Sequence, residues 1–189
     1  DQNIQETENG IHAKTVFEGS LSENIELKTG AEIIQRSYSQ RFFIPSGADY
    51  DLGFDEWITA GFGEMDIYAS NRFVTRAGVR LEYNNLIHKL SVDPRISLAL
   101  KTGGQGQFSL AYGRFRQSPK NEFLRINKAL GAEKAEHLIL NFQVIENNRT
   151  FRIETYYKKY DHLIRFENGT PYLLNNQGNG YAKGVELFW

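Results

Sequence analysis

Four histidines are the first residues to consider for catalytic or metal-binding chemistry. His12, His88, His137 and His162 are scattered along the chain without the spacing of metal ligands. The chain has no cysteine, which removes thiolate metal sites, and no HExxH or GxSxG motif occurs. The Gly-rich stretch 103–106 lacks the Lys-Ser/Thr of a phosphate loop. We therefore expect no enzyme activity, no bound metal and no cofactor.

Two arginines suggest a contact with lipopolysaccharide. Arg114 and Arg116 continue an alternating row that begins with Phe108, Leu110 and Tyr112. At the outer end of a membrane strand they would point outward, where guanidinium groups bind phosphates well. The alternative reading is an ordinary solvated strand end.

Aromatic residues in or beside the longest connections are candidates for ligand binding. They are Tyr50, Phe54, Trp57, Phe123, Phe166 and Tyr172. Their rings can stack on a sugar or an aromatic ligand, and the alternative is that they pack the loops together.

The elements that carry these residues alternate between short and long connections. Tight turns are expected at Ser22–Asn24, Ser70–Arg72, Thr102–Gly106 and Glu146–Arg149. Long excursions are expected at Gln40–Asp55, Asn85–Pro94, Ser118–Lys134 and Asp161–Asn179. This alternation is how an outer-membrane β-barrel is connected, with short periplasmic turns and larger external loops.

Nine segments alternate with period two, each near the ~9 to 11 residues that cross a bilayer when tilted. The clearest is Phe73–Tyr83, which has an apolar face and a face with Arg76, Arg80 and Glu82. The segments 11–21 and 57–69 alternate less cleanly, so the sequence does not decide which of their residues point to which side of the sheet. We predict an all-β, antiparallel up-and-down transmembrane β-barrel of about nine strands, part of a barrel of about 22.

The charges predict a balanced inner wall. The formal net charge of -1 gives no case for nucleic acid as a partner. If the polar rows face a lumen, neighbouring strands can pair their charges across the wall. The bases in these rows are Lys14, Lys28, Arg36, Arg76, Arg80, Arg95, Lys101, Arg152 and Lys158, and the acids are Glu18, Glu26, Glu32, Glu64, Asp66, Glu82, Glu154 and Glu186.

The second half of the chain resembles a known family. The stretches Pro94–Leu100, Phe108–Pro119, Glu133–Leu138 and Tyr156–Asp161 look like late barrel strands of TonB-dependent outer-membrane receptors, most of all the Bacteroidetes type. The likeness covers about residues 57–189 well and the first fifty only in general pattern.

This resemblance implies a receptor that takes up a scarce ligand across the bacterial outer membrane. The implied partners are outer-membrane lipid and lipopolysaccharide, a TonB-type energy-coupling protein acting through a plug domain, and a surface lipoprotein. No plug is present, so we expect residues 1–189 to be a β-barrel segment of a longer receptor, with Trp189 on the periplasmic side. Two alternatives stay open: a small complete outer-membrane barrel with an adhesion or structural role, and a soluble ligand-binding barrel.

Overall fold

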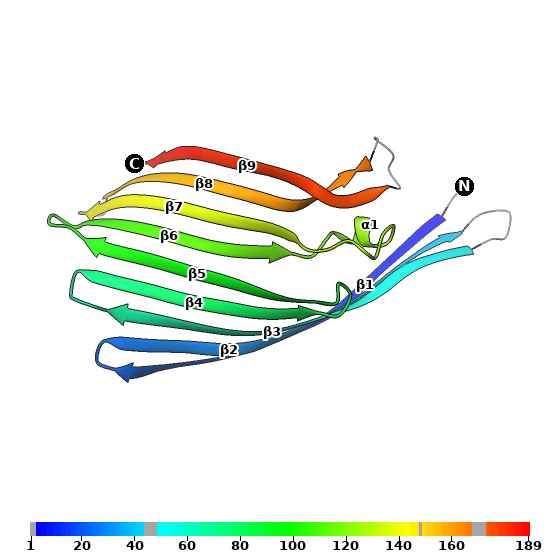
Figure 1. Ribbon diagram of the computed structural model, residues 1–189, viewed down its shortest axis with the longest axis horizontal. Coiled ribbons are helices and arrows are strands. Elements are labelled where there is room, and N and C mark those ends of the chain that lie inside the picture. The colour runs from blue at the N-terminus through cyan, green and yellow to red at the C-terminus, as the bar shows by residue number, and fades with distance from the viewer. Residues whose placement is uncertain (1–2, 44–48, 148, 168–172) are drawn as a thin grey trace.

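Nine antiparallel strands form one sheet in which each strand pairs with the next in the chain (Figure 1). The computed structural model describes residues 3–43, 49–147, 149–167 and 173–189, with side chains at all of them except 3, 43 and 49–51. The strands are β1 (Asn3–Ser22), β2 (Ile25–Phe43), β3 (Asp49–Tyr68), β4 (Phe73–Asn84), β5 (Lys89–Lys101), β6 (Gly106–Gln117), β7 (Glu133–Glu146), β8 (Arg149–Phe166) and β9 (Leu174–Phe188). The predicted all-β, up-and-down arrangement and strand number are confirmed.

The four predicted tight turns lie together at one end of the sheet, and β9 ends at that same end (Figure 1). The long excursions were predicted too long. β2 and β3 keep their pairing as far as Phe43 and Asp49, and β8 and β9 continue to Phe166 and Leu174. The strands therefore run from 12 to 20 residues, because the polar residues that suggested loops still pair with a neighbouring strand.

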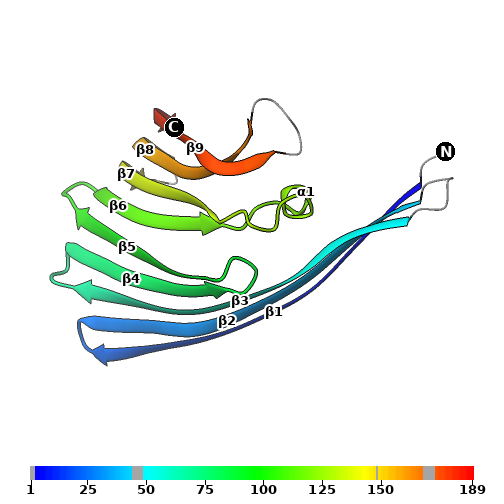
Figure 2. The ribbon, with the colours of Figure 1, turned by 45° about the vertical axis from the view of Figure 1, so that its right-hand side comes forward.

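The strands β1, β2 and β3 project beyond the rest of the sheet at the loop end (Figure 2). β4 ends at Asn84, opposite Ile58, while β3 begins at Asp49. At ~3.3 Å per residue the three strands extend roughly 30 Å further than β4. We call this three-stranded projection, residues 3–11, 35–43 and 49–57, the outer extension.

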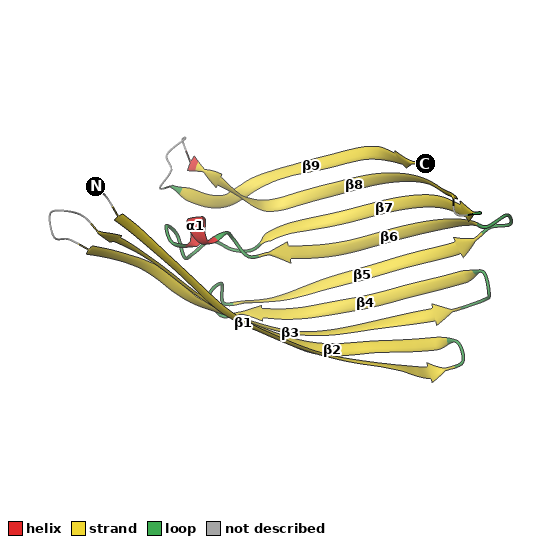
Figure 3. Ribbon diagram, turned by 180° about the vertical axis from the view of Figure 1, so that it is seen from behind, coloured by secondary structure: helices red, strands yellow, loops and turns green. Residues whose placement is uncertain are grey.

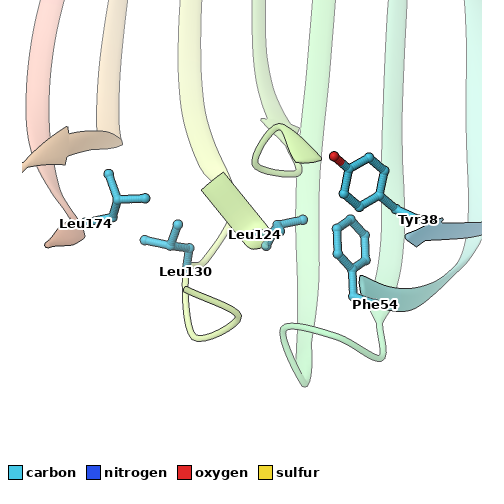
Figure 4. Close-up of a cluster of buried hydrophobic side chains, with 5 residues drawn as sticks. All are labelled: Tyr38, Phe54, Leu124, Leu130 and Leu174. Atoms are coloured by element: carbon cyan, nitrogen blue, oxygen red, sulfur yellow. The ribbon is translucent and has the colours of Figure 1, made fainter. Parts of the chain in front are cut away.

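The connection between β6 and β7, residues 118–132, folds against one side of the sheet. It contains the one-turn helix α1 (Asn121–Leu124). Leu124 and Leu130 of this connection form a buried cluster with Tyr38 of β2, Phe54 of β3 and Leu174 of β9 (Figure 4). We call residues 118–132 the strap, and the face of the sheet that carries Tyr38 and Phe54 the inner face.

The sheet is curved and open. It bends around the strap, since residues near both of its margins reach one cluster. Within the described residues, β1 and β9 are its two edges and do not pair with each other (Figure 3). In these same ranges no helix is long and apolar enough to cross a membrane.

Candidate functional site

The strand register assigns every paired side chain to the inner or the outer face. Residues directly opposite each other in antiparallel strands share a face, and successive residues alternate. Starting from Tyr38 and Phe54, the register places all the predicted lumen-facing bases and acids on the inner face. It also settles the facing of β1 and β3, which the sequence left open.

On β1 to β4 the inner charges pair across the wall. Arg76 binds Asp66 through two hydrogen bonds of 2.6 Å, from Nε and Nη2 to the two carboxylate oxygens. Arg80 of β4 donates to Glu82 at 2.8 Å and to Glu32 of β2 at 2.6 Å. The predicted pairing is confirmed on this half of the sheet.

The reach of Arg80 depends on a small residue. Ala60 of β3 lies between Glu32 and Glu82 in the register, so its methyl group leaves room for the guanidinium to cross β3. Arg80 thereby ties β4 to β2 across β3.

Three inner bases of β5 to β9 lie on aromatic rings, as Lys14 of β1 also does on Phe62. Arg95 lies 4.8 Å from the centroid of Phe115, Lys158 4.7 Å from Tyr156, and Arg152 5.9 Å from Phe188. None of these three bases forms an ion pair with a described carboxylate. These three bases are therefore not ion-paired within the described residues, and neither are Glu154 and Glu186, the acids on the inner face of β8 and β9.

The outer face is an exposed apolar band. Leu138 and Leu140 are each 47% exposed, although both belong to a central part of the sheet. Tyrosine and tryptophan occupy this face toward the loop end, at Trp57, Tyr83, Tyr112, Tyr157 and Tyr181, and phenylalanine occupies it toward the turn end, at Phe17, Phe73, Phe108, Phe142 and Phe151. Aromatic girdles that border an apolar band are typical of a lipid-facing barrel surface.

The alternation of polar and apolar residues inverts in the outer extension. Below it the outer face is apolar, while within it polar Gln35, Ser37 and Asp55 face outward and Tyr38 and Phe54 face inward. Trp57 lies at this changeover on the outer face and is 47% exposed. The inversion has a simple cause, because the outer extension rises out of lipid into water on one side and packs against the strap on the other.

A buried carboxylate holds the strap to the sheet. The Glu56 side chain is 2% exposed and accepts hydrogen bonds from Arg36 Nε at 3.0 Å and Arg36 Nη2 at 2.6 Å. Its other oxygen accepts from Asn84 Nδ2 at 2.6 Å and from the hydroxyl of Ser118, the first strap residue, at 3.0 Å. Four hydrogen bonds from three residues thus satisfy one buried anion.

Further contacts tie the strap to both sides of the curved sheet. Arg125 of the strap donates to Gln40 of β2. Asn176 of β9 bonds the backbone of Gly131 twice, at 2.7 and 3.0 Å, and Asn127 Nδ2 donates to the carbonyl of Leu174 at 3.1 Å. The strap therefore bridges β2 and β9 across the inner side.

The predicted ligand-binding aromatics do not form one group. Phe54 is only 6% exposed and stacks on Tyr38 in the strap cluster, with ring centroids 5.5 Å apart. Burial raises the pKa of the Tyr38 phenol, and the nearby Glu6 carboxylate raises it further, so this hydroxyl stays protonated at neutral pH. Trp57 faces outward, on the opposite side from Phe54.

Phe123 and Phe166 are the predicted aromatics that the structure brings together. Their ring centroids are 6.2 Å apart in an edge-on arrangement, and Phe166 is half exposed. Tyr172 and the side chain of Tyr50 lie outside the described residues. Ligand binding by the six aromatics stays a prediction.

Arg114 and Arg116 each meet a carboxylate at the loop end. Arg114 donates to Glu136 of β7 at 3.2 Å. Arg116 donates at 2.9 Å to Asp93, whose side chain is 5% exposed. Each pair occupies part of a guanidinium group, and the contact with lipopolysaccharide stays a prediction.

Sequence reasoning missed the residues that organise the loop end. Glu56 lies on β3 where the inner face becomes apolar, and Asn84 is the last residue of β4. No sequence motif marks either residue. The signal that was available is an acid, Glu56, between the apolar residues Phe54 and Ile58 of the inward row of β3. Among the described residues no three His, Cys, Asp or Glu side chains are grouped so that they could hold a metal ion.

These two faces define a class of protein: a segment of transmembrane β-barrel wall, with lipid outside and paired charges inside. Comparison with solved structures agrees. The chain is similar to a mutant of the ferric enterobactin receptor PfeA from Pseudomonas aeruginosa, with a TM-score of 0.82, 13% identity and coverage of 96% of this chain and 33% of that one.

Two further structures share the fold. The siderophore receptor PirA from Pseudomonas aeruginosa gives a TM-score of 0.76 at 14% identity, covering 96% of this chain and 37% of that one. The FrpB iron transporter from Neisseria meningitidis gives 0.76 at 15% identity, covering 97% and 33%. The chain thus spans about a third of the length of these proteins, and its fold is that of TonB-dependent receptor barrels.

These neighbours are bacterial outer-membrane receptors and transporters, which agrees with the predicted location in the bacterial outer membrane. No protein-family model matches the sequence. No curated protein matches it either.

Proposed function

We propose that this chain forms part of the barrel wall and outer loops of an outer-membrane receptor that takes up a scarce ligand with energy from a TonB-type protein. The observation that supports this most is the division of the sheet into an exposed apolar face and an ion-paired inner face, on a fold shared with siderophore and iron receptors. The plug domain, and the strands that complete the barrel, would lie outside residues 1–189. The Bacteroidetes type rests on the sequence motifs alone.

The orientation can be tested with single cysteines, because the chain has none of its own. Glu122→Cys in the strap should react with a membrane-impermeant maleimide on intact cells. Glu146→Cys beside a tight turn should react only after the outer membrane is permeabilised. Labelling of both on intact cells, or of neither, would reject the orientation.

Energy-coupled uptake needs a separate test in cells that carry the full-length gene. The structural neighbours include a ferric enterobactin receptor, a siderophore receptor and an iron transporter, so a panel of radioactive ferric chelates is the first set of probes. We expect accumulation of at least one chelate only when a working TonB protein is present. Equal accumulation with and without that protein would reject the proposal.

The alternatives make different predictions. A soluble barrel would bury its apolar face, whereas the apolar band of this sheet is exposed. A small complete barrel with an adhesion or structural role would need no plug and no coupling protein. Plug sequence upstream in the reading frame and further strands downstream would decide for the receptor. We expect no enzyme activity and no resident cofactor in either case.

A further inference from the structure

The pairing between β5 and β6 stops short of the loop end. The last pair is Arg95 opposite Gly113. Beyond it, residues 89–94 of β5 stay paired with β4, and residues 114–117 of β6 stay paired with β7. The two strands diverge toward the loop end, as Figure 2 shows. We call this break between residues 89–94 and 114–117 the seam.

Pro94 explains why the pairing ends there. Thr102 donates its backbone N–H toward β6, to the carbonyl of Gly106 at 2.8 Å. Because alternate residues of an antiparallel strand bond to the same neighbour, Pro94 also faces β6. Proline has no N–H to donate, so the next pair, with Arg114, does not form. The strands β4 to β7 all belong to this chain, so the seam does not arise from parts of a receptor outside residues 1–189.

Within the described part of the chain, one ion pair spans the seam. Arg116 Nε donates to the buried Asp93 carboxylate at 2.9 Å. The register puts Asp93 in the inner row of β5 and Arg116 in the outer row of β6. The guanidinium therefore passes between the two strands, and on the inner side it lines a cavity of about 190 Å³ together with Ser91.

The strap crosses the seam directly after β6 ends. Ser118, its first residue, donates to Glu56 of β3 at 3.0 Å and accepts from Asn84 of β4 at 3.2 Å. The strap thus leaves β6 on one side of the seam and is anchored on the other side. A wider seam would draw Ser118 away from both of these partners.

We propose that the pair of Arg116 and Asp93 is a latch that keeps the seam narrow and the strap in place. When the pair breaks, β5 and β6 separate further at the loop end, Ser118 leaves Glu56 and Asn84, and the strap opens. No ladder hydrogen bond between β5 and β6 has to break, because the strands are not paired at the seam. The latch lies in the wall itself, so it does not rest on coupling to a TonB-type protein or on a particular ligand.

Two spin labels on the outer face measure the width of the seam in the full-length receptor. Continuing the register of β5 and β6 places Val92 in the same row as Arg116 and Lys134, so labels at Val92→Cys and Lys134→Cys span the seam. In Arg116→Gln the distance between them, read by electron paramagnetic resonance, should increase. The reason is that the Asp93 carboxylate loses its partner and gains water when the seam opens.

A second pair of labels lies on the paired part of the same strands. Ile96→Cys and Leu138→Cys flank Tyr112 in one row, so this pair also spans β6. The distance between these two labels should not change in Arg116→Gln. Residues 1–189 contain no cysteine, and any cysteine elsewhere in the receptor is replaced by serine.

Tryptic cleavage after the exposed strap residue Lys128 reports opening of the strap. Arg116→Gln should raise its rate at least about tenfold, because the latch is a charge-assisted hydrogen bond. Arg114→Gln is the matched control: Arg114 donates to Glu136 at 3.2 Å, but that pair joins β6 to β7, which are paired there. This variant should change the rate by no more than about twofold.

Heat-modified mobility on gels verifies that each variant has folded, and Asp93→Ala serves if Arg116→Gln does not fold. The proposal is overturned if breaking the latch leaves either the label distance across the seam or the cleavage rate unchanged. It is also overturned if Arg114→Gln changes both as much as Arg116→Gln does.

Discussion

Neutralising Glu56 should loosen the strap. In Glu56→Gln the amide keeps one oxygen for Asn84 or Ser118 but turns its NH₂ toward Arg36, which then lacks a counter-charge. Removing one partner of a buried pair costs about 3–5 kcal/mol. Because the Arg36 side chain is 24% exposed, water compensates part of this loss, and we expect about 2–3 kcal/mol.

The assay is tryptic cleavage after Lys128, an exposed strap residue. A protease cuts a folded segment through its transient open form, so the rate follows the opening free energy when closing is fast. A loss of about 2–3 kcal/mol corresponds to cleavage roughly 30- to 150-fold faster. The opening reaction here is release of the strap, not unfolding of the sheet.

Glu64→Gln is the matched control for this experiment. Glu64 is also an inner-face carboxylate of β3 paired with an arginine, but Arg76 keeps its stronger partner Asp66 and nothing in the strap touches it. Its cleavage rate should stay within about threefold of the original. If Glu56→Gln also stays within that limit, Glu56 does not hold the strap and the reasoning is refuted.

Three further predictions concern the two faces and the strap. Leu140→Arg, on the exposed apolar band, should cost about 2–4 kcal/mol on folding into bilayers, whereas Asn141→Arg on the inner face should cost little; equal losses would contradict the assigned facing. Changing both Arg114 and Arg116 to Ala should reduce the lipopolysaccharide that co-purifies with the protein, and unchanged retention would sink the predicted contact. Leu124→Ala should lose about 2–5 kcal/mol of strap stability through the cavity it leaves, seen as faster cleavage of the strap, and an unchanged rate would show that the cluster does not anchor it.

The alternation of polar and apolar residues at every second position was sufficient to predict the sheet and, for most strands, which side chains share a face. Segments such as Phe73–Tyr83 alternate over their whole length because lipid lies on one side and paired charges on the other. The tight turns were also visible, since residues such as Asn147 (φ 48) and Gly104 (φ 70) adopt the left-handed backbone that such turns require.

The outer extension could not be predicted in this way. The alternation of polar and apolar residues shows that a strand has two faces. It does not show where along the strand the apolar face changes from the outer to the inner side, and in β1 and β3 this change falls in the middle of the strand. The same inversion made Gln40–Asp55 read as a loop. What fixes the facing there is packing with the strap, in the buried cluster that contains both Phe54 and Leu124, and no local pattern encodes it.

The inversion and the strap together explain where three inner bases without a carboxylate partner lie. At the loop end the inner side is filled by apolar packing around Leu124 and is closed by the Glu56 network, so free cations would have no solvent there. Arg95, Lys158 and Arg152 instead lie on β5 to β9 below the strap, each supported by a ring that tolerates a cation without neutralising it. On β2 to β4, in contrast, Arg76 and Arg80 meet carboxylates. Because Glu154 of β8 and Glu186 of β9 are not ion-paired within the described residues either, this side of the wall offers charges of both signs to groups outside those residues.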